Sequence, residues 1–118
     1  MTMTRETVSV GTPENGIVRL DHHRPDSHDP TRTLWLLTES VPWLVAQIAA
    51  ILRDWSHPDV KADLSVDHFD LFVRGPDAYF VLFIHNHRDE AAPHGGLSGV
   101  ALSEEMTSNA LAALQGVL

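Results

Sequence analysis

The sequence predicts a single α+β domain over residues 1–118, in which a small antiparallel sheet, made of an N-terminal hairpin and a central hairpin, packs against two helices. Two pairs of short apolar runs flank turn-forming residues, a pattern typical of β-hairpins. Two longer segments repeat apolar residues every three or four positions, which is typical of amphipathic helices. The length suits one domain, and 43% hydrophobic residues suffice for a core.

The N-terminal hairpin is predicted from residues 7–10 and 17–20, because Gly, Pro and Asn occupy the segment between them. Residues 21–31 contain two prolines and no apolar side chain, so we expect a loop there that is flexible, as are residues 1–6. Residues 33–37 favour a short strand over the first turn of a helix.

The first helix is predicted over residues 41–55. Ser40 is a suitable N-cap, and Pro42 fits the first turn because no amide donor is needed there. The apolar surface of this segment is wider than one sheet face requires, which predicts burial between layers or contact with another chain, a second copy included. Its main stripe consists of Leu44, Ile48, Ile51, Leu52 and Trp55.

The last helix is predicted to begin after Ser103, whose side chain can accept a hydrogen bond from the first turn. Glu104 and Glu105 match the positive end of the helix dipole. Its apolar stripe consists of Met106, Ala110, Leu111, Leu114 and Val117. The preceding residues, 87–101, hold one proline and three glycines and are expected to form a long loop.

The central hairpin is predicted from residues 63–73 and 78–86, with the turn at 74–77. The apolar residues of the first strand change parity near Asp67-His68, which indicates a bulge or a break. Both faces of the second strand are apolar, which is typical of a central strand.

The charge of the chain excludes some partners. The formal net charge is −8 and Lys61 is the only lysine, so the chain lacks the cations that neutralise nucleic-acid phosphates. A basic protein partner suits this charge better, and we expect no nucleic acid.

The chain also lacks the features of a membrane or disulfide-stabilised protein. Its most apolar stretch, residues 41–52, is shorter than the roughly 20 residues that a spanning helix needs, so we expect no membrane contact. The absence of Cys removes thiol nucleophiles and thiolate metal sites. Together with a polar N-terminus that leads into no apolar segment, it indicates a cytoplasmic protein.

A histidine group on the central hairpin is the best candidate for chemistry. His85 and His87 lie two apart at the end of a predicted strand, so both side chains point to one face, roughly 7 Å apart. The predicted register places His68 diagonal to His85, and three imidazoles are a ligand set of catalytic zinc. Asp89 and His94 can assist. A bulge at Asp67-His68 would instead move His68 to the other face.

The remaining motifs give weaker support for a functional site. A second group, His22, His23 and His28, lies in the predicted 21–31 loop, where no apolar residue fixes ligand geometry, and we interpret it as solvated. The Gly-rich segment 94–99 does not match Gly-x-Ser-x-Gly, which a nucleophile elbow requires.

We therefore expect a small, acidic, non-enzymatic binding or regulatory protein without a cofactor. It would act through protein contacts, as an inhibitor or immunity-type factor, or as a homodimer formed through residues 41–55. The alternative is a metal-binding protein or metal-dependent enzyme that holds zinc with His68, His85 and His87.

Overall fold

The computed structural model describes residues 6–25, 31–56, 60–67, 69–77, 79–86 and 97–118. Its elements confirm the α+β class. The chain order is β1 (Thr7–Val10), β2 (Ile17–His23), β3 (Thr31–Leu37), η1 (Thr38–Ser40), α1 (Val41–Arg53), β4 (Val60–Val66), β5 (Phe69–Asp77), β6 (Tyr79–Asn86), β7 (Leu97–Leu102) and α2 (Glu104–Gln115).

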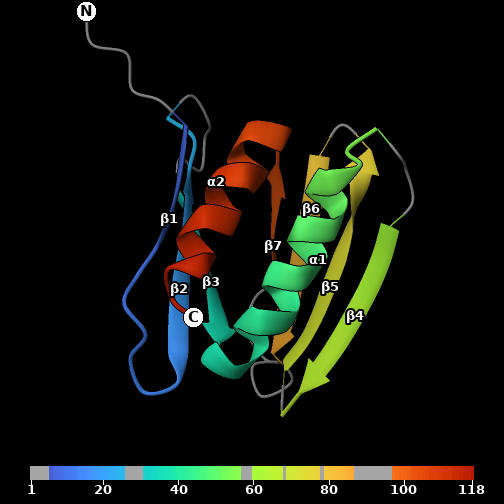
Figure 1. Cartoon of the computed structure of the whole chain (residues 1–118). Coiled ribbons are helices and arrows are strands. Elements are labelled where there is room, and N and C mark those ends of the chain that lie inside the picture. Colours follow the sequence, from blue (N-terminus) through green and yellow to red (C-terminus); the bar gives the residue numbers. More distant parts are fainter. Residues whose placement is uncertain (1–5, 26–30, 57–59, 68, 78, 87–96) are drawn as a thin grey trace, which may run out of the picture.

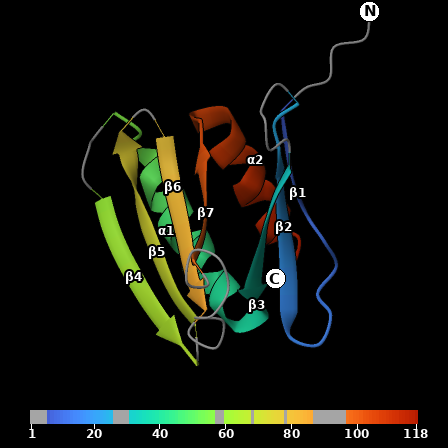
Figure 2. The same ribbon diagram turned by 180° about the vertical axis from the view of Figure 1, so that it is seen from behind.

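The strands form two antiparallel sheets rather than the single sheet expected, with the orders β1-β2-β3 and β4-β5-β6-β7. Both helices lie on the same side of the two sheets (Figure 1). From behind, no helix of the described residues covers the other side (Figure 2). The sheets meet where β3 lies next to β7, and they are inclined to each other around the helices.

One hydrophobic core joins both sheets and both helices. Burial alternates along the strands, so that every second residue faces the helices. Each fully buried Val, Leu, Ile or Phe side chain stabilises the fold by about 1.5–3 kcal/mol relative to exposure. The strands contribute Val18, Leu20, Leu34, Leu36, Phe69, Leu71, Val73, Phe80, Leu82, Ile84, Val100 and Leu102. The helices contribute Val41, Leu44, Ile48, Ile51, Met106, Ala110 and Leu114.

The starts of both helices were predicted correctly, but only one cap was. The Ser103 side chain accepts a hydrogen bond from the backbone nitrogen of Met106 at 3.3 Å, as expected of an N-cap. Ser40 does not cap α1, because it ends the turn η1 in a helical conformation. Its hydroxyl instead donates to the carbonyl of Leu37 at 2.6 Å.

The predicted strand over residues 63–73 was wrong, because the chain reverses within it. Val66 of β4 pairs with Phe69 of β5, so only two residues separate the strands. Asp67, the first of them, has a φ of 53°, a left-handed conformation common in tight hairpin turns. Of the two alternatives that the parity change indicated, the break is therefore correct: it marks a turn between two strands rather than a bulge within one.

The register between β5 and β6 also differs from the prediction. Strand β5 continues to Asp77, so Leu71 pairs with Ile84 instead of Phe80. The shift covers an even number of residues, and each side chain therefore keeps its predicted face.

Two predicted loops contain strand residues. His22 and His23 belong to β2, and β3 already begins at Thr31, so the predicted 21–31 loop was too long. Leu97–Leu102 forms β7, which pairs with β6 along its whole length. These strand residues were missed because the first segment is polar and the second is rich in glycine. They form strands because β2 pairs with β1 and β3, and β7 pairs with β6.

Candidate functional site

His85 is the described member of the predicted metal site. It lies on β6, partly buried, on the face turned away from the helices, and it pairs in register with Asp70 of β5. The Ser65 hydroxyl of β4 donates to the Asp70 carboxylate at 2.7 Å. A serine, a carboxylate and an imidazole thus lie in one row across three strands.

The other predicted ligands fall outside the part of the chain that the structure describes. These are His68, His87, Asp89 and His94. Within the described residues, no group of three or more His, Asp and Glu side chains is arranged to hold a metal. Of the three predicted histidine ligands, the β5–β6 register places only His85, so the three-histidine site stays a prediction.

His22 and His23 are structural residues of β2 rather than members of a solvated loop. His22 is 2% exposed, and its Nε2 is hydrogen-bonded to the Glu6 carboxylate at 2.5 Å. His23 Nδ1 is 2.8 Å from the Thr31 hydroxyl of β3. The Glu6 contact satisfies a polar group that would otherwise be costly to bury.

The uncovered face of the β4–β7 sheet carries exposed aromatic side chains. Phe72 of β5 and Phe83 of β6 are direct cross-strand neighbours, and they are 43% and 42% exposed. Tyr79, at the start of β6, is 52% exposed. We call Phe72, Tyr79 and Phe83 the aromatic face; these residues alternate with the buried residues of β5 and β6 and therefore point away from the helices. Clustered exposed apolar side chains mark interaction surfaces.

Helix α1, by contrast, leaves little apolar surface free. Its large side chains are buried or pack partly against the core. The exposed positions along it include Pro42, Ala46 and Ala50, which are small. The excess apolar surface expected on residues 41–55 is therefore mostly used in packing. Neither described helix is long and apolar enough to cross a membrane.

The apolar residues on both faces of β6 already indicated the aromatic face in the sequence, but they were interpreted only as the sign of a central strand. Strand β6 is apolar on both faces, and it is central in its sheet, as predicted. A strand with two apolar faces is normally covered on both. Here the described helices cover one face only, so the second apolar face remains exposed.

Charged residues are distributed unevenly between the two sides of the molecule. Lys61 and Arg74 pair across β4 and β5 on the same face as Phe72. Asp63 and Asp70 share that face, so its charge is mixed. The helical side carries Glu39, Asp54, Glu104 and Glu105 against Arg53. The net charge of −8 therefore does not describe the aromatic face.

Gly99 of β7 lies beneath the aromatic ring of Phe83. A Cβ atom added at Gly99 would lie 2.7 Å from Phe83 Cε1 and closer still to Cδ1, so the ring occupies the space that a side chain would need. The Gly99 carbonyl accepts a hydrogen bond from the Arg32 guanidinium of β3 at 3.4 Å, which links the two sheets.

The comparisons with known proteins add no functional information. The chain matches no protein-family model, and neither the curated proteins nor the solved structures give a significant match.

Proposed function

We propose that the chain is a small, non-enzymatic binding protein that contacts another protein through the aromatic face of its β4–β7 sheet. The carrying observation is that β6 has two apolar faces while the described helices cover only one. Exposed Phe and Tyr side chains are enriched at protein interfaces, where they bury large apolar areas. A regulatory role in the cytoplasm, as an inhibitor or immunity-type factor, accords with small size and the absence of Cys.

The charged residues around the aromatic face indicate which charges the partner's surface carries. The net charge of −8 favours a basic partner at long range. At contact, however, Lys61 and Arg74 flank the aromatic pair, and screening limits distant charges because the Debye length is about 8 Å at physiological salt. The proposal therefore includes partner carboxylates opposite these two cations and partner cations opposite Asp63 and Asp70, which share the face.

Site-specific cross-linking tests the proposal. A photo-reactive amino acid in place of Tyr79, on the aromatic face, is expected to give a discrete cross-linked product in native extract. The same substitution at the exposed Ala46 of α1 is the matched control and is expected to give none. The added mass distinguishes a different partner from a second copy of the chain.

Substitution of the aromatic pair then tests which residues carry the contact. Phe72→Ala combined with Phe83→Ala is expected to weaken binding by about 30-fold or more, because truncating a central aromatic contact commonly costs about 2 kcal/mol. Equal cross-linking from Tyr79 and Ala46, or an unchanged product in the double variant, would overturn the proposal.

As a second candidate function, we propose that the chain binds a metal at His85, because His85 pairs with Asp70 on an accessible face. An imidazole and a carboxylate at neighbouring strand positions are common zinc ligands. Titration of tag-free protein with zinc is expected to give one site, weakened at least about tenfold by His85→Ala combined with His87→Ala. His23→Ala is the control and should leave the affinity unchanged. Absence of stoichiometric zinc binding would reject the metal site.

A further inference from the structure

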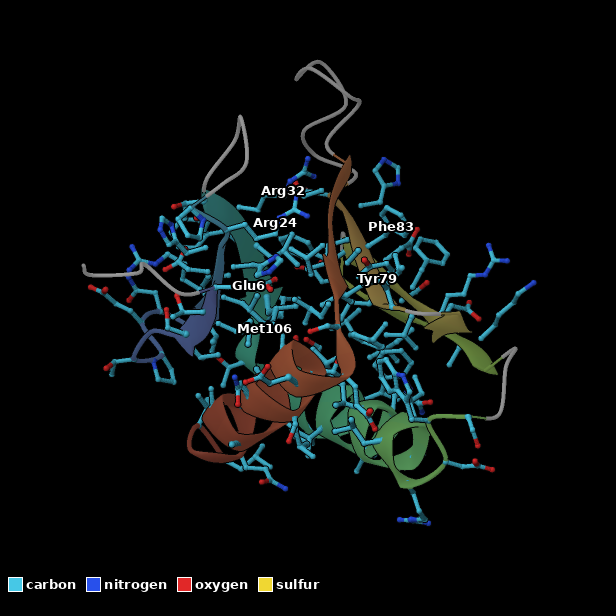
Figure 3. All side chains as sticks on the ribbon, turned by 90° about the horizontal axis from the view of Figure 1, so that it is seen from above. Glu6, Arg24, Arg32, Tyr79, Phe83 and Met106 are labelled. Carbon is cyan, nitrogen blue, oxygen red and sulfur yellow. The ribbon has the colours of Figure 1, made fainter. Side chains whose placement is uncertain are left out.

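A separate cavity of about 290 Å³ lies between the two sheets, on the side away from the helices. One wall comes from the β2–β3 hairpin and carries Arg24 and Arg32. The opposite wall comes from β6 and β7. Figure 3 places both arginines in the space between β3 and β7, with Phe83 on the far side of β7.

The polar wall of this cavity is cationic, although the chain as a whole is strongly acidic. Two guanidinium groups and His22 line the cavity, and none of its lining residues in the described part of the chain is Asp or Glu. Glu6 is bonded to His22. Arg24 is exposed and forms no ion pair with any carboxylate of the described residues. Two arginine side chains beside one cavity attract an anionic group, and guanidinium forks match carboxylate geometry.

The opposite wall is apolar. Val81 and Ala101 pair across β6 and β7 and face the cavity, beside the ring of Phe83. Gly99 presents no side chain, which leaves its carbonyl accessible to Arg32. An inorganic anion would leave this wall unused. A ligand that uses both walls has one carboxylate and one apolar body.

We propose that this cavity binds a small organic acid that carries a carboxylate on a single aromatic ring or a body of similar size. Arg24 and Arg32 hold the carboxylate, and the apolar body lies against Val81, Phe83 and Ala101. The volume of about 290 Å³ lies just below the range of about 300–1,000 Å³ usual for ligand sites, which favours a ligand of this small size. This binding site shares the Phe83 side chain with the aromatic face, but its contacts with Arg24, Arg32, Val81 and Ala101 are separate from the protein contact proposed above.

Two-dimensional amide NMR of the full chain tests the proposal, with phenylacetate as the probe. Phenylacetate is expected to bind saturably and to shift the amides of Arg24, Gly99 and Ala101. Its neutral analogue phenylacetamide and inorganic phosphate are each expected to bind at least about tenfold more weakly, because the first lacks the charge and the second lacks the apolar body.

Variants then assign the contacts. Arg24→Gln is expected to weaken phenylacetate binding at least about tenfold, since a charge-assisted hydrogen bond is lost. Arg32→Lys keeps the charge but loses the planar fork, and is expected to weaken binding less. Arg53→Gln on α1 is the matched control and should bind phenylacetate like the unaltered chain. The amide spectrum of each variant also reports whether the fold is retained.

Four results would overturn the proposal. They are no saturable binding of phenylacetate, equal binding of phenylacetamide, equal binding of phosphate, or shifts confined to other amides. If an acidic peptide shifts these amides and phenylacetate does not, the cavity belongs to a protein contact. Loss of cross-linking at Tyr79 with phenylacetate binding intact would refute only the protein contact.

Discussion

Replacing Phe80 by alanine is expected to lower the free energy of unfolding by about 3–5 kcal/mol, the usual cost of truncating a buried Phe. Phe80 is 1% exposed, it is the largest fully buried side chain among the described residues, and it pairs with Leu102 of β7. Small domains are stable by only about 5–15 kcal/mol, so this variant loses a large share of its stability. Urea denaturation followed by circular dichroism measures the loss.

Phe83→Ala is the matched control, because it makes the same chemical change three residues later on the same strand. Phe83 faces away from the helices and is 42% exposed, so its truncation removes less buried area than that of Phe80. We expect a loss of about 1 kcal/mol. If Phe83→Ala were as destabilising as Phe80→Ala, the β4–β7 sheet would have a covered second face, and the proposed interaction surface would be refuted.

The sequence predicted those parts of the fold that depend on local patterns. The 3–4 spacing of apolar residues in α1 and α2 gives their burial, because the period of a helix is set by the backbone alone. The two parities of the apolar residues within 63–73 correspond in the same way to the faces of β4 and β5 that pack against the core. These features need no knowledge of which strands pair.

Strand ends and pairing partners were predicted less accurately than these local features. The parity change near Asp67 fits both a bulge and a tight turn, and only the pairing of Val66 with Phe69 decides between them. Strand β7 contains a glycine at its centre, which lowers its strand propensity. Its pairing with β6 and the ring of Phe83 above Gly99 compensate for this, and both lie far from it in sequence.

The candidate sites depend even more on tertiary structure. Strand periodicity predicted that His85 shares a face with His87, but it could not identify Asp70 as the neighbour of His85, because the predicted β5–β6 register was shifted. The contact of Arg32 with Gly99 joins residues 67 positions apart in different sheets. No local pattern encodes how two sheets are inclined, so the arginine-lined cavity could be found only in the folded chain.

Replacing Gly75 by alanine is expected to cost more than about 2 kcal/mol. Gly75 is buried in β5 at the irregularity between Arg74 and Asp77, and its φ of 150° is a conformation that residues with a Cβ rarely adopt, at a cost of about 1–3 kcal/mol. An added Cβ would also lie 3.0 Å from the Tyr79 carbonyl oxygen, which belongs to the backbone and cannot rotate away.

Gly16→Ala is the control, because Gly16 also has a positive φ but no atom within 4 Å of the added Cβ, and we expect a smaller cost, about 1 kcal/mol, there. Urea denaturation of both variants measures the difference. A Gly75 variant no less stable than the Gly16 variant would show that the β5–β6 connection can shift, and the pairing of Phe72 with Phe83 would then not be fixed by this glycine.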